Sequence, residues 1–237
     1  VGNSAKQTTR QFYIDNTNVL ITEISEDGQP KLKITDFCPR FDRQGTMFRP
    51  CSLFRIVEPL DTGVSIKVSL KPIEGWSKSP ASGARTDGAL EFLMRDEYLR
   101  VSTNMSLTYL TEETPFALRE KIYFGLTWSF PLEGDVVEIA ESYLRRTIDY
   151  WRTWVKHCSI PTQFQTETIR SALALKLHYY EDTGAILAAT TTSLPEEVGG
   201  VRNWDYRYCW LRDAYFFLSA FYNLGHFEEM EGFLKYV

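Results

Sequence analysis

The spacing of apolar residues changes once along the chain, and this change constrains the fold more than any other feature. Between residues 11 and 128, apolar side chains mostly recur at every second position, and residues 64–70 alternate strictly. After Pro131 the spacing becomes three or four, from Val137 to Val155. A period of two is typical of half-buried strands, and a period near 3.6 is typical of amphipathic helices. The sequence therefore predicts a β part followed by an α part.

The first part predicts an antiparallel β-sandwich over residues 1–133. Residues 19–24 are rich in β-branched side chains, and an Asp-Gly turn separates them from the alternating run 31–37, which is the pattern of a hairpin. Further short runs at turn-like intervals are 91–94, 98–102, 106–110 and 121–128. Regularly spaced short strands of this kind favour two packed antiparallel sheets.

The second part predicts a linker helix within residues 134–160 and further helices in 161–237. One helix is expected to open at Thr162, where T-x-x-Q fits a capping box, and another to run over 211–224 and stop at Gly225. A fourth helix begins at Phe227. Helices separated by long polar loops suggest stacked hairpins whose loops gather at one end, where a site could form.

Composition excludes several kinds of function. A formal net charge of −5 over 237 residues, with no cluster of Lys and Arg, argues against nucleic acid as a partner. No apolar run approaches the roughly 20 residues that span a bilayer, and the first residues lack a signal-peptide pattern, so no membrane partner and a cytoplasmic location are expected. The sparse, scattered cysteines and histidines indicate neither a metal site nor a disulfide scaffold, and no cofactor is expected.

The stretch 203–214, NWDYRYCWLRDA, carries the clearest functional signal. Taken singly, each residue has an ordinary structural explanation: Asp213 favours a helix N-terminus by about 0.3 to 1 kcal/mol, Arg212 could form a surface ion pair, and the aromatic rings could anchor the loop. Together they form a set suited to a sugar, because aromatic faces cover pyranose C–H patches while carboxylate and guanidinium groups bind hydroxyls. Carbohydrate binding is the favoured interpretation.

At these residues the chain resembles the glycoside hydrolases of family 15, which include glucoamylases, glucodextranases and some trehalases. Residues 199–214 read GGVRNWDYRYCWLRDA, which matches the D-Y-x-Y-x-W-x-R-D motif of that family. The resemblance continues through NTNVLIT, TDFCPRFDRQGTMFRP, IDYWRTWV and TGAILAATTTSLPEE, so it covers almost the whole chain. It implies an N-terminal β-sandwich, a linker helix and an (α/α)6 barrel, of which residues 161–237 would be the first, incomplete part.

The resemblance also implies roles for individual residues. Arg212 and Asp213 would hold hydroxyls of the non-reducing terminal glucose of an α-glucoside, an oligosaccharide or disaccharide. Tyr206 and Trp210 would line the same subsite. The supporting residues would be Asp205 and Tyr208. The loop 39–42 would lie near the barrel mouth, whereas its composition alone favours a hairpin connection pinned by its own aromatic residues.

Family 15 enzymes resemble one another in mechanism, which is inverting hydrolysis by two carboxyl groups about 6.5 to 9.5 Å apart. Both groups are glutamates of later hairpins, so the general acid and base are expected beyond Val237. The chain alone would then be inactive and would self-associate through the unfinished barrel, where Phe216, Phe217, Phe221 and Phe233 would be exposed.

Two other functions stay open from the residues alone. A non-catalytic carbohydrate-binding or interaction module could keep the same motif, and it would be monodisperse and bind oligosaccharide by itself. A phosphorylase-like enzyme would need a phosphate-cradling loop, which the sequence does not show. The sequence also leaves the glucosidic linkage undefined.

Overall fold

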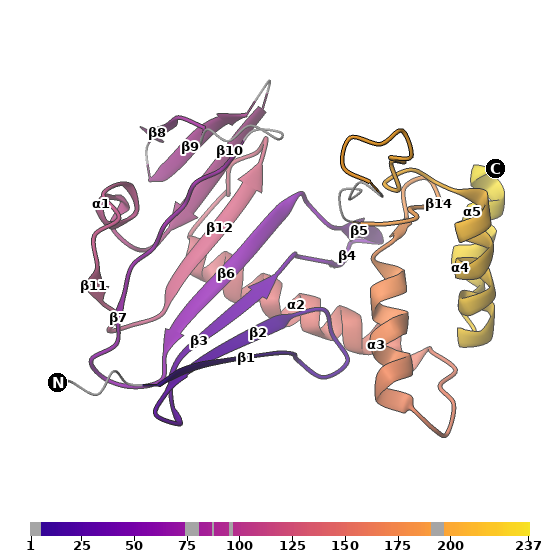
Figure 1. Cartoon of the computed structure of the whole chain (residues 1–237), viewed down its shortest axis with the longest axis horizontal. Coiled ribbons are helices and arrows are strands. Elements are labelled where there is room, and N and C mark those ends of the chain that lie inside the picture. Colours follow the sequence, from indigo (N-terminus) through magenta and orange to yellow (C-terminus); the bar gives the residue numbers. More distant parts are fainter. Residues whose placement is uncertain (1–5, 74–80, 87, 95–96, 191–196) are drawn as a thin grey trace. The chain divides into compact units, whose positions relative to one another are not determined.

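The computed structural model describes residues 6–73, 81–86, 88–94, 97–190 and 197–237 (Figure 1). The chain forms two compact units. The first consists of Val1–Asp15 and Val19–Tyr150, and the second consists of Asn16–Asn18 and Trp151–Val237. In the described ranges, no helix is both long enough and apolar enough to cross a membrane.

An eight-stranded antiparallel sheet forms the body of the first unit, which confirms the predicted β part. Its strand order is β1-β2-β3-β6-β12-β10-β9-β8. The predicted hairpin joins β2 to β3 through Asp27 and Gly28, both at positive φ, as a tight two-residue turn requires. The strands are β1 (Gln7–Tyr13), β2 (Leu20–Glu26), β3 (Gln29–Phe37), β6 (Ser52–Pro59), β8 (Gly83–Thr86), β9 (Ala89–Met94), β10 (Glu97–Thr103) and β12 (Ile122–Trp128).

One face of this sheet is covered by α2 (Val136–Lys156), the linker helix that the spacing predicts. The Asp135 side chain accepts hydrogen bonds from the backbone N–H groups of Val137 and Glu138 and so caps the start of the helix. Val136 and Ala140 then pack against buried sheet residues such as Phe54. Because neighbouring strand residues alternate between faces, Ile56 contributes to this core while Val57 contributes to the opposite one.

The opposite face carries a smaller second layer. It consists of the two-stranded sheet of β7 (Ser65–Ile66) and β11 (Phe116–Ala117), together with the short helix α1 (Leu107–Thr111). The alternation predicted for residues 64–70 is confirmed in the packing, since its apolar residues lie against the core, yet only 65–66 form a ladder. These packed residues are Val64, Ile66, Val68 and Leu70. In the described part of the chain, the second layer is thus much narrower than the main sheet.

The loop after β3 forms a small hairpin, β4 (Phe41–Arg43) and β5 (Thr46–Phe48), that is pinned to α2. Phe41 and Phe48 stack on each other at 4.9 Å, and each lies 5.3 Å from the Tyr143 ring. The Arg146 guanidinium lies 3.8 Å from the Phe41 ring centroid and donates a hydrogen bond to the Asp42 carbonyl. The aromatic residues therefore anchor this hairpin, as its composition suggests, and its place near a barrel mouth stays a prediction.

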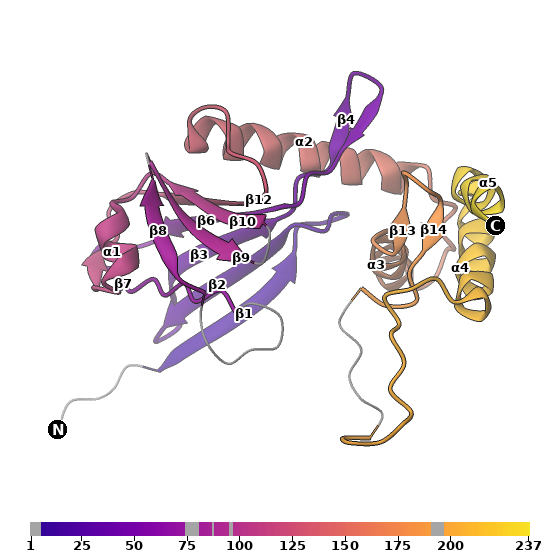
Figure 2. The same ribbon diagram turned by 90° about the horizontal axis from the view of Figure 1, so that it is seen from above.

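The second unit contains three helices after the end of α2 and a short hairpin (Figure 2). The helix stop predicted at Gly225 is confirmed, because this residue has φ 80° and its N–H and that of His226 close the last turn of α4. The capping box at Thr162 is wrong: the helix begins later, with Phe164 in a left-handed conformation as its N-cap. The elements are α3 (Gln165–Lys176), β13 (Tyr179–Tyr180), β14 (Ala185–Ile186), α4 (Leu211–Leu224) and α5 (Phe227–Tyr236).

The aromatic residues expected at unfinished flanks divide into two groups. Phe216 is 66% exposed, in line with the expectation, whereas Phe217 is only half-buried. Phe221 and Phe233, however, are buried, at 0% and 6% exposure. The expectation was wrong for these two because α4 and α5 pack on each other and α5 also packs on β14, which covers their inner faces.

Candidate functional site

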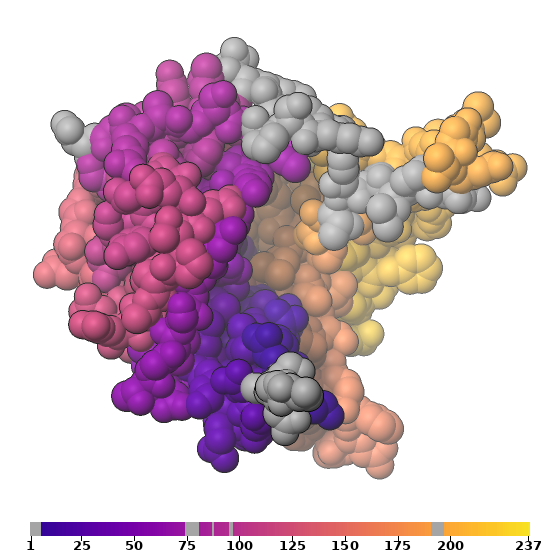
Figure 3. Space-filling model, turned by 60° about the vertical axis from the view of Figure 1, so that its left-hand side comes forward, coloured from indigo at the N-terminus to yellow at the C-terminus, as the bar shows by residue number. Residues whose placement is uncertain are grey.

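The segment that carries the motif is bound through backbone hydrogen bonds to the residues that follow β14. The N–H of Ala188 donates to the Tyr208 carbonyl at 3.1 Å, and the N–H of Ala189 donates to the Tyr206 carbonyl at 2.6 Å. The orange part of the chain that precedes α4 stands out from the surface in Figure 3. The two bonds fix the middle of this exposed segment, so that its side chains occupy defined positions.

Asp205 organises the segment internally. Its carboxylate accepts hydrogen bonds from the backbone N–H of Arg207 at 2.9 Å and from the guanidinium of the same residue at 2.6 to 3.2 Å. Its carbonyl accepts a hydrogen bond from the Trp210 indole at 3.1 Å. These contacts shape the loop and orient Trp210, while the supporting role of Asp205 in a sugar site stays a prediction.

Aromatic rings gather around Trp210. The Tyr206 ring lies 5.3 Å away at 35°, and the Trp204 ring lies 6.2 Å away nearly perpendicular. Tyr206 and Trp210 are half-buried, whereas Trp204 is 51% exposed and Tyr208 is 70% exposed. The structure thus brings together the two rings that the sequence assigns to one subsite and leaves part of their surface open to a ligand.

Arg212 and Asp213 lie in the first turn of α4, as predicted. The N-cap residue Trp210 has an extended backbone, and its side chain makes no capping hydrogen bond to the first turn of the helix. Oδ2 of Asp213 is buried and forms no hydrogen bond in the described ranges, and its nearest cation is Nη2 of Arg212 at 3.6 Å. A buried carboxylate oxygen without a hydrogen bond is costly, which indicates a group prepared for a donor.

This arrangement can bind a polyhydroxylated ring. The mostly exposed Arg212 side chain offers several N–H donors, Asp213 offers an acceptor that lacks a hydrogen bond, and the aromatic pair offers flat apolar surface. In the part of the chain that the structure describes, no cluster of His, Cys, Asp and Glu could hold a metal ion.

A second polar cluster in the same unit was not found from the sequence. Glu229 accepts hydrogen bonds from Nζ of Lys176 at 2.9 Å and from the Trp154 indole at 3.4 Å, and its other oxygen lies 3.7 Å from Nδ1 of His226. Nε2 of His226 lies 3.1 Å from Sγ of Cys158, and its ring stacks on Trp154 at 4.3 Å. No local pattern could have found this cluster, because its members are up to 75 residues apart.

Burial sets the protonation of this cluster. Burial lowers the pKa of His226, and the nearby Glu229 offsets only part of that effect, so the imidazole is kept neutral. Burial alone would raise the pKa of Glu229, but Lys176 outweighs it and the net shift is downward. Burial and the charge of Glu229 raise the pKa of the Cys158 thiol to about 11. The cluster therefore holds a Lys–Glu ion pair beside a neutral His and a neutral thiol, which is not the state of an activated nucleophile.

Known proteins resemble this chain along most of its length. Residues 164–236 match the model of the glycosyl hydrolases family 15. A trehalase of Thermoplasma acidophilum is 34% identical over 94% of this chain and 39% of its own length, and a trehalase of Thermoplasma volcanium is 33% identical over 94% of this chain and 36% of its own. A trehalase of Mycolicibacterium smegmatis is 37% identical over 59% of this chain and 22% of its own length. No solved structure gives a significant match.

The chain thus spans about two fifths of the length of the Thermoplasma relatives, and the family match includes the motif and the helix that carries Arg212 and Asp213. This chain is a relative of the glycosyl hydrolases of family 15 and resembles trehalases along most of its length.

Proposed function

We propose that residues 205–213 form one wall of a glucose-binding subsite in a glycoside hydrolase that cleaves α-glucosides. Trehalose is the first substrate to test, because the most similar relatives described above are trehalases. The observation that carries the proposal is the buried Asp213 oxygen without a hydrogen bond, which lies at an uncapped helix N-terminus beside Arg212. A sugar hydroxyl would supply the missing donor once the carboxylate, whose side chain is 32% exposed, rotates to present this oxygen.

Different residues of the proposed subsite make different kinds of contact with the sugar. Asp213 and Arg212 bind hydroxyls of the terminal glucose, each by a hydrogen bond to a charged group, which is worth about 1.5 to 3 kcal/mol. Tyr206 and Trp210 pack against the C–H faces of the ring. Asp205 and Tyr208 support them: Asp205 through its bonds to Arg207 and Trp210, and Tyr208 through the backbone bond to Ala188.

The proposed reaction is inverting hydrolysis with release of glucose from the non-reducing end. It needs a carboxylic acid to protonate the leaving oxygen and a carboxylate to activate water. We assign neither role to a residue of this chain, and we propose that residues 161–237 contribute the substrate-binding start of a helical barrel. Inversion releases the glucose attacked by water as the beta anomer, and with trehalose the second glucose leaves as the alpha anomer.

The first experiment measures glucose release from trehalose, maltose, maltotriose and isomaltose by this chain and by any longer product of the same gene. We expect activity only in the longer product, and before mutarotation NMR should show equal amounts of alpha- and beta-glucose from trehalose and beta-glucose from the non-reducing end of the other substrates. Activity of this chain alone would contradict the assignment of the catalytic carboxylates. Inactivity of both proteins, combined with oligosaccharide binding by the short chain, would replace the hydrolase with a carbohydrate-binding module.

Two variants of the active product test the subsite directly. Asp213→Asn and Arg212→Ala each remove a charged hydrogen bond to the sugar, so kcat/KM should fall roughly 10- to 150-fold. Arg202→Ala is the matched control, because Arg202 is exposed and lies outside the motif. Equal kcat/KM values for the Asp213 and Arg202 variants would remove Asp213 from the subsite.

We also propose that this chain self-associates through the apolar outer surface of α4 and α5. Large apolar side chains with exposures of 55% to 72% lie there, and such a contiguous surface favours association. These residues are Leu211, Tyr215, Phe216, Tyr222, Phe227 and Leu234. Light scattering should show a mass that rises with concentration, and Phe216→Ser should reduce it. A strictly monomeric chain would contradict this part of the proposal.

A further inference from the structure

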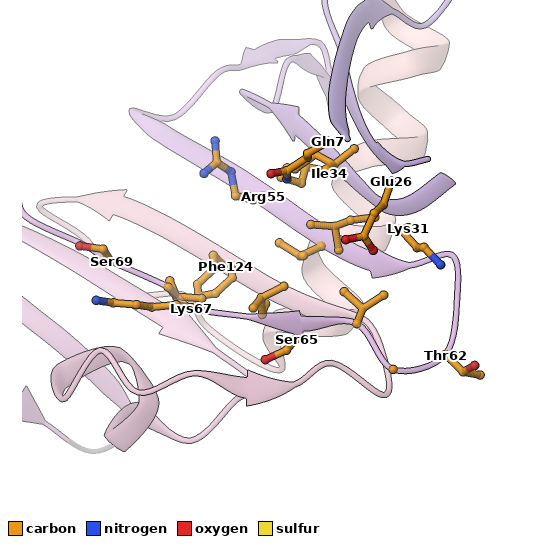
Figure 4. Close-up of a pocket in the computed structure, with 17 residues that line it drawn as sticks. Gln7, Glu26, Lys31, Ile34, Arg55, Thr62, Ser65, Lys67, Ser69 and Phe124 are labelled. Atoms are coloured by element: carbon orange, nitrogen blue, oxygen red, sulfur yellow. The ribbon is translucent and has the colours of Figure 1, made fainter. Parts of the chain in front are cut away.

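A trough of about 710 Å³ lies in the first unit beside the narrow second layer (Figure 4). One wall is the continuous segment 62–69, and the floor consists of main-sheet residues, of which Leu32, Val57 and Phe124 are only 5% to 7% exposed. The floor is apolar at its centre, where Ile24, Ile34 and Phe124 contribute side chains. Its volume falls within the range of typical ligand sites, from about 300 to 1,000 Å³.

The wall of the trough is the free edge of a strand. On the other edge, the N–H of Leu118 donates to the Val64 carbonyl at 2.8 Å, and Ile66 pairs with Phe116 of β11. Alternate residues of an antiparallel strand direct their backbone groups to opposite edges, so Ser65 and Lys67 direct theirs away from β11. In the described ranges these two residues form no backbone hydrogen bond. The N–H and C=O groups of Ser65 and Lys67 therefore form a short unpaired edge beside the trough.

Three of the four charged residues that line the trough are cations, and neighbouring carboxylates balance their charge. Lys31, Arg55 and Lys67 carry positive charge and Glu26 carries negative charge. Each cation is paired with a carboxylate that does not line the trough, for example Lys67 with Glu113 at 3.2 Å. Lysine and arginine have several N–H donors each, so these side chains can still bind a further acceptor.

We propose that the trough binds an extended peptide of a partner chain, which adds as a strand to the free edge of residues 64–69. The unpaired N–H and C=O groups of Ser65 and Lys67 favour a ligand that alternates donors and acceptors, as a peptide strand does. The apolar floor requires apolar side chains at every second position, and the three cations favour acidic flanks. Six extended residues span about 20 Å, which suits a guest strand of common length.

The test uses a fluorescein-labelled synthetic peptide of nine residues, Asp-Asp-Val-Thr-Val-Thr-Val-Asp-Asp, and measures fluorescence anisotropy on titration with this chain. A peptide with lysine in place of aspartate should bind at least severalfold more weakly. Two further peptides carry N-methyl groups, one on all valines and the other on all threonines. In a strand these two sets of N–H groups point to opposite edges, so only one methylated peptide should lose binding.

A matched pair of variants locates the site on the protein. Lys67 and Lys71 both pair with Glu113, at 3.2 and 3.1 Å, but only Lys67 lines the trough. Lys67→Glu should weaken binding of the acidic peptide by roughly twofold to fivefold, and Lys71→Glu should leave it unchanged. Circular dichroism and thermal unfolding of both variants establish that they are folded.

Three results would overturn the proposal. The first is an acidic peptide that does not bind at millimolar protein, and the second is an equal loss of binding for the two methylated peptides. The third is a dimer of this chain that Lys67→Glu dissociates and Lys71→Glu does not, because the trough would then be occupied by a second copy. None of these outcomes depends on glucose release, so they are independent of the proposed hydrolase function.

Discussion

Gly232 allows a quantitative test of how the second unit is packed. This residue lies in α5 and faces Tyr179 and Gly184 of the strand hairpin. A Cβ atom at position 232 would lie 2.0 Å from the Tyr179 hydroxyl oxygen and 3.2 Å from its Cζ atom. Both are closer than ordinary contacts, and the Tyr179 ring has little room to move because it is 9% exposed and packs edge-on against Phe221.

Two opposing effects set the magnitude for Gly232→Ala. Overpacking in a filled region costs about 1 to 3 kcal/mol, while the better helix propensity of alanine returns about 1 kcal/mol. We expect a net loss of up to about 2 kcal/mol, because the 2.0 Å approach to the Tyr179 hydroxyl places this site at the costly end of the range. In the described part of the chain the Tyr179 hydroxyl forms no hydrogen bond, so Tyr179→Phe should cost little by itself and should restore most of the stability of Gly232→Ala.

Gly184→Ala provides the contrast. Its Cβ would lie 2.1 Å from the backbone carbonyl oxygen of Gly232, which cannot move without α5, and its φ of 82° disfavours any side chain. This variant should be less stable than Gly232→Ala, and Tyr179→Phe should not rescue it. Urea unfolding followed by tryptophan fluorescence measures the unsubstituted chain and all five variants. The reasoning fails if Tyr179→Phe rescues both glycine variants equally or neither.

The buried cluster and its cysteine give three further predictions. Stability should fall as pH drops below about 6.5, because the unfolded chain protonates His226 before the folded chain does. It should fall again below about 4.5, because the unfolded chain also protonates Glu229 first. Urea unfolding at a series of pH values measures both steps, and a flat stability profile from pH 7 to 5 would contradict the first. Lys176→Met should cost about 3 to 5 kcal/mol because it leaves Glu229 buried without its cation, and adding Glu229→Gln should recover part of that loss. Cys158 should react with iodoacetamide far more slowly at pH 8 than exposed Cys51 does. At pH 8 only about a thousandth of a thiol with a pKa of about 11 is ionised, and the thiolate is the reactive form. Equal reaction rates by mass spectrometry would refute this prediction.

Local sequence patterns predicted the type and the buried face of an element better than they predicted which other segment it pairs with. Residues 64–70 show why: alternation correctly identified the buried face, because that depends on which side chains are apolar. It could not tell that only Ser65 and Ile66 pair with another strand, because pairing depends on which segment lies alongside. The linker helix and the stop at Gly225 were predictable, since periodicity and left-handed glycine are local properties.

Features that depend on tertiary contacts were not predictable. The pattern T-x-x-Q at Thr162 is locally favourable, yet the helix starts after Phe164 in a conformation that the sequence does not suggest. Phe221 and Phe216 are equally apolar, and only the packing of α4 decides that the first is buried and the second exposed. At the candidate site, the motif identified Asp213, but the missing hydrogen bond of its Oδ2 atom emerged only from the structure.

The helix α2 belongs to both compact units, since the first ends at Tyr150 and the second resumes at Trp151 in the middle of the same helix. Forming the first turn of a helix costs free energy, whereas adding residues to an existing helix does not, so residues of both units share one nucleation step. Folding of the sheet that buries the beginning of α2 therefore lowers the entropic barrier for the turn that carries Trp151 and Trp154. Native-state hydrogen exchange should consequently show graded protection along α2 rather than a sharp step at residue 150.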